Sequence, residues 1–149
     1  MQSWLENGWI RRREPSLKEI TSLLAIARRD LAASRVVALD SDNRFVLAYN
    51  AARTLCNLAL SAEGYTAAKL PNEHQRQVES IEFTLGPTKK ELASYLTLIR
   101  GKRHNLEYER AGLVVERDVT ELIAKVDALH TDVVNWLRAA HPKLVPPGA

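Results

Sequence analysis

The chain has 149 residues, of which 46% are hydrophobic and 26% are charged, and it contains six glycines, six prolines and one cysteine. This composition is that of an ordinary globular protein of one-domain length, and it excludes a disordered chain, a collagen-like repeat and a disulfide scaffold. The formal net charge of +3 is small, so it favours a nucleic-acid partner only if the basic residues are concentrated in one place.

The first 15 residues are interpreted as an N-terminal extension. Trp4, Trp9 and Ile10 occur here among charged residues, and three arginines at 11–13 follow them. A secretory signal peptide has its positive charge before a continuous apolar stretch, so this order does not match one. We expect the tryptophans to cap the helices or to extend a dimer contact. The arginine run is expected to be a solvated charge cluster, with a nucleic-acid or partner contact as the alternative.

The first helix is expected to begin after Ser16 and to end near residue 34. Ser16 and Glu19 are spaced as a capping box, in which each side chain accepts a hydrogen bond from the backbone N–H of the other residue. Apolar residues then recur at spacings of three and four, as on a helix with one buried face. They are Leu17, Ile20, Leu24, Ala27 and Leu31.

A second helix is expected from about residue 43 to 63. The turn at 40–43 is rich in residues that cap helix N-termini, and Gly64 stands where a C-terminal glycine is expected. Small residues and one tyrosine at 48–52 let a neighbouring helix approach closely. Cys56 lies in this helical pattern, which favours a small buried side chain over a reactive thiol.

A short helix and two further long helices follow. Residues 64–72 are expected to form a loop and 73–85 a short surface helix. Thr88 and Glu91 form a second capping box, which predicts a long helix to about Arg110. Gly112 is expected to break the chain after this helix. The last helix then has apolar residues at spacings of three and four: Val119, Leu122, Val126, Leu129, Val133 and Trp136.

This last helix is expected to end at Pro142, before a tail over 142–149. No segment of useful length alternates with the period of a strand, and no internal repeat or interdomain linker is visible. The sequence therefore predicts an all-α protein with a single domain over 1–149. Its expected architecture is an up-and-down antiparallel four-helix bundle with an additional short helix and an N-terminal extension.

One predicted helix violates its own apolar pattern, because two arginines occupy its buried face. That face follows Leu92, Leu96, Ile99, Arg103, Leu106 and Arg110. A buried guanidinium costs several kcal/mol unless its charge is paired or the surface is wet. The two arginines are therefore expected to reach solvent at the end of the bundle, to pair with Asp118 or Asp127, or to line an open cleft.

The same stretch is the densest basic cluster in the chain, and its glycine costs a helix about 1 kcal/mol relative to alanine. A close approach by a second chain or a phosphate would explain Gly101. Arg103 and His104 are consecutive and point to different faces of a helix, so their convergence on one atom requires either a distorted helix or a second copy. We therefore expect a homodimer. The cluster comprises Arg100, Gly101, Lys102, Arg103, His104, Asn105, Leu106, Glu107 and Tyr108.

The chain resembles a small prokaryotic HEPN domain, which belongs to a helical family of toxin-antitoxin and defence modules. The resemblance covers most of the chain and rests on its length, its helical pattern, the helix at 44–64 with its 48–52 core, and the arginine-polar motif followed by Tyr108. Competent members are metal-independent ribonucleases with an arginine, a polar residue and, after four to six intervening positions, a histidine. Two such motifs usually meet across a dimer cleft.

The resemblance implies Arg103, His104 and Arg100 as candidate catalytic residues, without a metal or another cofactor. A histidine can act as general acid or base on RNA, whose 2′-hydroxyl is the nucleophile, and an arginine can stabilise the charge that develops on the phosphate. The resemblance also implies a binding role for neighbouring residues, namely Lys102, Asn105, Glu107, Tyr108 and Arg110.

The motif is degenerate at its decisive position. Tyr108 stands where a histidine is expected after Arg103, and His104 follows Arg100 by one position too few. Tyrosine, with a pKa near 10, is a poor base at neutral pH. Related helical proteins accompany minimal nucleotidyltransferases, so the resemblance also suggests such an enzyme as a partner, with Tyr108 as a hydroxyl that accepts a nucleotide.

We therefore interpret the protein as a HEPN-like component of a toxin-antitoxin or defence module that binds RNA, a nucleotide or a minimal nucleotidyltransferase. One alternative is an active ribonuclease in which His104 works with Arg103 or Arg100 across a dimer, and the other is a helical interaction module without a site. No stretch approaches the roughly 18 apolar residues of a membrane span, and we expect a cytoplasmic location. The other histidines are too scattered to hold a metal: His74, His130 and His141.

Overall fold

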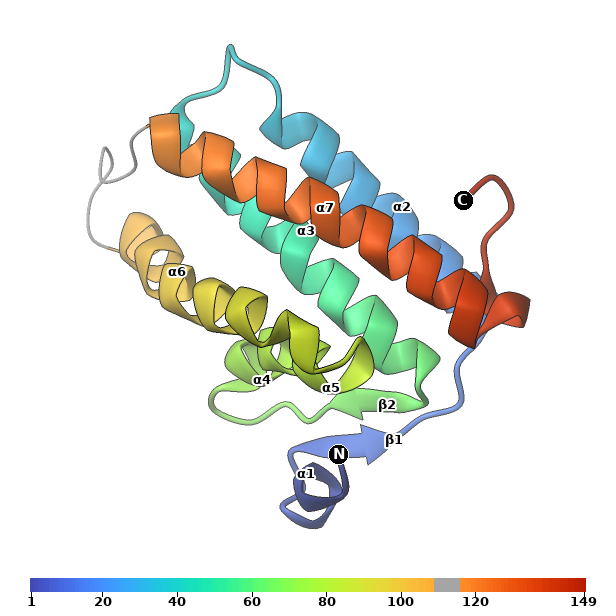
Figure 1. Ribbon diagram of the computed structural model, residues 1–149. Helices are drawn as coiled ribbons and strands as arrows, with labels where there is room; N and C mark the ends of the chain where they lie inside the picture. The colour runs from blue at the N-terminus through green and yellow to red at the C-terminus, as the bar shows by residue number, and fades with distance from the viewer. Residues whose placement is uncertain (109–115) are drawn as a thin grey trace.

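The computed structural model describes the backbone of residues 1–108 and 116–149, and the side chains of residues 1–101 and 116–149. Within these ranges the chain is mostly helical, and its only sheet has two short strands (Figure 1). The prediction of a helical protein is confirmed. The expected break at Gly112 lies outside the described residues.

The first long helix, α2 (Leu17–Ser34), begins as the sequence predicts. The Ser16 hydroxyl accepts a hydrogen bond from the Glu19 N–H at 3.1 Å. The Glu19 carboxylate forms an ion pair with Arg13 at 3.3 Å. In the predicted capping box it would instead accept a hydrogen bond from the Ser16 N–H. Leu17 is exposed at the start of the helix, while the four later apolar residues of the predicted stripe are buried.

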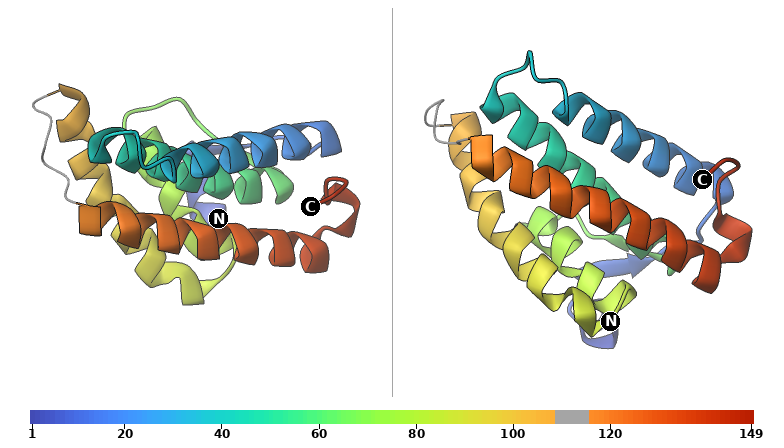
Figure 2. Two further views of the ribbon diagram at one scale, coloured as in Figure 1. Left: turned by 90° about the horizontal axis from the view of Figure 1, so that it is seen from above. Right: turned by 45° about the horizontal axis from the view of Figure 1, so that its top comes forward.

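Helix α3 (Ser41–Ala62) is the central element of the fold. The Asp40 side chain caps its N-terminus by accepting from the Asn43 N–H at 2.8 Å, and Gly64 follows its last turn with a φ of +92°. Its buried residues face α2, α6 (Lys90–Tyr108) and α7 (Glu116–Ala140), which are arranged around it in Figures 1 and 2. The small residues at 48–52 are buried as expected, and Cys56 is fully buried among them.

A two-stranded antiparallel sheet joins the N-terminal extension to the segment after α3. Strand β1 (Ile10–Arg12) pairs with β2 (Tyr65–Ala67), with Ile10 opposite Ala67. The expectation that 64–72 is a loop without strand structure is therefore wrong. Three-residue strands are too short to show a period, and their pairing joins positions more than fifty residues apart.

The extension also supplies a small second core. Trp4, on the short helix α1 (Gln2–Glu6), packs with Ile10, Leu60 and Ala67. Its ring meets that of Trp9 edge-on at 6.0 Å between centroids. Within the described chain, the tryptophans therefore cap one end of the helices, as one of the two sequence interpretations expects.

The segment between α3 and α6 (Lys90–Tyr108) differs from the prediction in two places. The expected helix at 73–85 is divided into α4 (Glu73–Glu79) and α5 (Ile81–Thr84). The expected capping box at Thr88 is absent from the described residues, because Pro87–Lys89 form a 3-10 turn that runs directly into α6. Proline at the first position of that turn fixes φ and gives the helix its start in place of a side-chain cap.

Helix α7 runs parallel to α3 and packs on it (Figure 1). The apolar residues predicted to be buried on this helix are buried from Val119 to Val133. One turn after Val133 the buried residue is Leu137, while the predicted Trp136 is only half-buried. The helix ends at Ala140, and Pro142 opens a second 3-10 turn, as the sequence indicates. None of the described helices is long and apolar enough to cross a membrane.

Candidate functional site

The basic cluster lies on the C-terminal part of α6. This helix is continuous through Tyr108, so the backbone of 100–108 is helical as predicted. The apolar face that leads to it is also as predicted, with Leu96 fully buried and Ile99 7% exposed. Position 103 follows Ile99 by one turn on the same face of the helix. These side chains, and Arg110 altogether, lie outside the described residues: Lys102, Arg103, His104, Asn105, Glu107 and Tyr108.

Arg100 and Gly101 are the described members of the cluster. Arg100 is half-buried, and Gly101 is exposed. A methyl group placed on Gly101 would meet no atom of the described chain within 4 Å. Packing within the described chain therefore does not require a glycine here, although glycine costs a helix about 1 kcal/mol relative to alanine.

The two carboxylates expected as partners for the arginines have different surroundings. Asp127 accepts a hydrogen bond from Arg35 at 2.7 Å, so its described partner is an arginine at the end of α2. Asp118 lies on α7 beside a cavity that also touches Ile99. Of the two candidates, Asp118 is therefore the one adjacent to the basic end of α6.

This cavity opens between α3, α6 and α7 and has a volume of about 350 Å³. Phe45 forms a buried wall, and Ile99 connects the cavity to the last described turn of α6. Most of the wall is apolar, and the acidic side chains come from the first turns of α7. The lining consists of Phe45, Tyr95, Leu98, Ile99, Asp118 and Glu121.

Tyr95 has a perturbed environment in this cavity. Burial, followed by the negative charges of Glu121 and Asp118, raises the pKa of its phenol to about 12. The Lys125 ammonium lies 4.8 Å from the centre of its ring. At neutral pH Tyr95 is therefore a protonated hydrogen-bond donor and an aromatic surface.

Sequence reasoning missed Phe45, Tyr95 and Glu121 as site residues, because the cavity arises where three helices meet. Tyr95 precedes Ile99 by four positions, and that one-turn spacing was the available signal.

Arg44 joins α3 to the end of α2 and to the first residue of α7. This side chain is 7% exposed, its Nε donates to the Ser34 carbonyl at 2.7 Å, and its Nη1 donates to Glu116 at 2.6 Å. Ser41 donates to the same carboxylate at 2.9 Å. The hydrogen bond from Ser41 and, with a smaller effect, the hydrogen bond from Arg44 lower the pKa of Glu116. The start of α7 is therefore fixed against the α2–α3 turn.

The three remaining histidines lie apart, each beside a different partner. The Arg53 guanidinium lies 2.8 Å from His74 Nε2, and Arg28 donates to His130 at 3.0 Å. Burial, and then the charge of Arg28, lowers the pKa of His130. His141 lies 3.5 Å from Glu63. Within residues 1–101 and 116–149, no group of three or more His, Cys, Asp or Glu side chains is placed to hold a metal ion.

The arginine run at 11–13 is a solvated cluster with local contacts. Arg11 and Arg12 are exposed on β1, and the Arg12 guanidinium lies 5.7 Å from the centre of the Tyr65 ring. These contacts are consistent with the first of the two sequence interpretations.

Comparisons with protein-family models, with curated proteins and with solved structures found no match. The HEPN resemblance therefore rests on the residues of this chain.

Proposed function

We propose that this protein is a HEPN-like four-helix bundle that binds single-stranded RNA through the basic segment 100–110 and does not cleave it. The observation that supports this most directly is the course of α6. The helix continues from its buried Leu96 and Ile99 into the basic segment without a break. The arginine at position 103 thus follows an apolar face at the end of the molecule where the cavity of Tyr95 opens.

The chemistry of this end suits a nucleic-acid strand. Arginines bind phosphates through charge and paired hydrogen bonds, and aromatic side chains provide a surface on which a base can stack. Tyr95 adds a phenol that remains protonated at neutral pH. Without a histidine at the spacing of competent HEPN ribonucleases, the segment has a phosphate clamp but no base at the expected position.

We further propose that the RNA-binding form is a homodimer and that the protein acts within a toxin-antitoxin or defence module, with a minimal nucleotidyltransferase as a partner. The geometry of consecutive helical residues supports the dimer, because such residues lie about 100° apart around the axis. Arg103 of one copy and His104 of another can meet where those of one copy cannot. Sedimentation equilibrium tests the dimer directly.

The test of the function is RNA binding in EDTA, measured by fluorescence anisotropy of a labelled single strand over a series of salt concentrations. Arg103→Ala and Arg100→Ala are expected to weaken binding and to reduce the slope of log K against log salt by about 0.7 for each lost phosphate contact. Arg29→Ala is the matched control, because it removes the same charge from an exposed position on α2.

RNA binding that is equally affected by the Arg29 control, or absent at low salt, would overturn the proposal. Cleavage of the strand in EDTA that disappears in His104→Ala would replace it with the ribonuclease alternative.

A further inference from the structure

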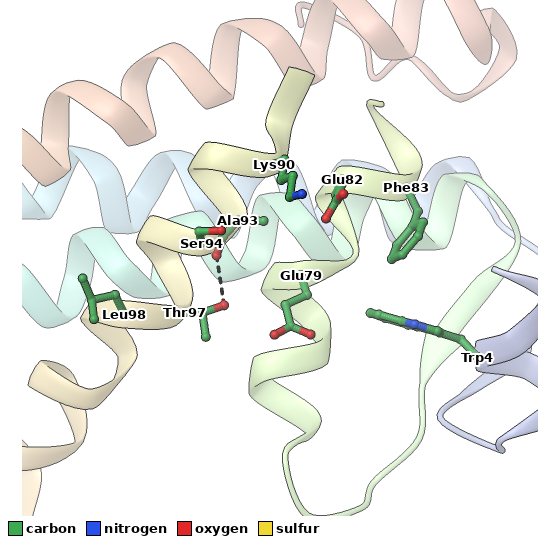
Figure 3. A pocket seen from close by; sticks show the side chains of 9 residues that line it. All are labelled: Trp4, Glu79, Glu82, Phe83, Lys90, Ala93, Ser94, Thr97 and Leu98. Carbon is green, nitrogen blue, oxygen red and sulfur yellow. Dashed lines mark hydrogen bonds between the residues drawn. The ribbon is translucent and has the colours of Figure 1, made fainter. Parts of the chain in front are cut away.

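An open groove lies on the face of the molecule formed by α4, α5 and α6 (Figure 3). Its volume is about 420 Å³, and Trp4 from α1 closes one end while Leu98 stands at the other. Leu98 also lines the cavity of Tyr95, whereas the other residues of this groove are separate from that cavity and from the basic segment 100–110.

The groove exposes large apolar side chains. Leu98 is 77% exposed and Phe83 is 47% exposed, although both line the same depression. Exposed apolar residues that gather in a depression with a polar rim mark a binding surface more often than isolated ones do. Leu98 and Phe83 therefore provide apolar anchoring points at the two ends of the groove.

The aromatic end of the groove is held rigidly. The Trp4 and Phe83 rings meet edge-on, with centroids 5.1 Å apart and an interplanar angle of 69°. Trp4 also contacts Trp9, over which the Arg76 guanidinium lies at 4.3 Å. A partner that binds here therefore meets an ordered aromatic surface, which reduces the entropy cost of binding.

The floor of the groove is the outer face of α6, which is long enough for a partner helix to lie on and carries small side chains. The face of α6 from Lys90 to Leu98 covers eight residue steps, or about 12 Å, which corresponds to two turns of a helix lying against it. Between these residues lie small side chains, Ala93, Ser94 and Thr97. The Thr97 hydroxyl donates to the Ala93 carbonyl at 2.9 Å, so its hydrogen bond is satisfied within α6 (Figure 3).

The rim of the groove is negatively charged. Glu79 and Glu82 lie on α4 and α5, opposite α6, and Lys90 is the cation on the α6 side (Figure 3). Among the described side chains, none forms an ion pair with these three residues; Glu79 accepts one hydrogen bond, from the neutral Gln75 at 2.8 Å. Two carboxylates on one wall therefore remain available for the cations of a partner.

We propose that this groove binds a basic amphipathic helix of a partner protein. Apolar residues at i, i+3 or i+4 and i+7 of that helix contact Phe83 and Leu98, and its lysines or arginines face Glu79 and Glu82. A second copy fits less well, because a two-fold contact through the same patch brings the carboxylates of one copy toward those of the other.

The test uses a labelled synthetic helix of about 15 residues, with leucines in one stripe and lysines beside it, and a matched peptide in which glutamates replace the lysines. Binding of each peptide is measured by fluorescence anisotropy. The lysine peptide is expected to bind more tightly. Leu98→Ser and Phe83→Ser are expected to weaken it about tenfold, which is the effect of losing a central apolar contact.

Glu82→Gln is expected to weaken the lysine peptide about twofold to fivefold at low salt, and this difference should vanish at high salt. Two controls match these changes elsewhere on the surface. Val37→Ser alters a residue that is 83% exposed in the α2–α3 turn, and Glu14→Gln neutralises an exposed carboxylate near β1. Both controls are expected to bind the peptide as the unmodified protein does.

Absence of lysine-peptide binding, equal binding of both peptides, or equal loss in the Val37 control would overturn the proposal. Sedimentation of Leu98→Ser distinguishes the other occupant, because a dimer that dissociates in this variant would assign the groove to a second copy. RNA binding is measured in Phe83→Ser, because Phe83 lines the groove and not the cavity of Tyr95. Loss of peptide binding with RNA binding retained supports the groove as the peptide-binding site. The RNA proposal is then tested separately by its own variants.

Discussion

Arg44→Met removes a buried guanidinium while keeping a side chain of similar length. In the native protein, Arg44 Nε donates to the carbonyl of Ser34, which belongs to the last turn of α2 and has no acceptor role within that helix. Methionine leaves this carbonyl without its charged donor. Hydrogen bonds to charged groups contribute about 1.5–3 kcal/mol, and the variant is expected to lose free energy of unfolding in that range.

Urea denaturation followed by circular dichroism measures this loss. With a urea dependence of about 1–3 kcal/mol per molar, the midpoint should fall by roughly 1 M. Arg11→Met is the matched control, because that guanidinium lies on an exposed position of β1. It should change stability by less than about 0.5 kcal/mol. An Arg44 variant as stable as this control would refute the idea that Arg44 anchors the start of α7.

Three further outcomes are expected. Glu116 has a lowered pKa in the folded protein, so its stabilising effect is complete above its unfolded pKa and is lost as the pH falls through the folded value; Glu116→Gln should flatten the unfolding free energy against pH in that acid range. The Cys56 thiol is fully buried, and burial raises its pKa to about 12, so a thiol reagent should label it only at the rate of unfolding, as mass spectrometry of native and urea-treated protein can show. Arg103→Leu should raise thermal stability while lowering RNA affinity, whereas a gain in stability with affinity unchanged would indicate an arginine without a binding role.

The helices could be predicted because their signals are local. Ser16 caps α2 as its spacing with Glu19 indicates, and the apolar stripe of α7 is buried from Val119 onward. The prediction fails where distant parts of the chain decide the conformation. Ile10 pairs across a sheet with Ala67, which lies more than fifty positions along the chain. The spacing of apolar residues by three and four positions indicates a helix, and it contains no information on such contacts.

The same division applies to the candidate site. The basic cluster around Arg100 is visible in the sequence, because charge and helical spacing are both local properties. The cavity beside it is not visible, because Phe45, Tyr95 and Asp118 belong to three different helices. Arg44 is likewise an ordinary charged residue in the sequence, and only the meeting of α2, α3 and α7 shows that it is buried and paired.

The sequence by itself determined that the chain is helical, where its long helices lie, and that its basic residues gather at one end of α6, since each of these depends on residues within a few turns of one another. Only the tertiary structure decided that Leu98 and Phe83, which are ordinary apolar residues in the sequence, remain exposed and face one groove with Glu79 and Glu82. Burial depends on which elements pack together, and α6 presents one face to α3 and α4 while no described element covers the outer side of the groove.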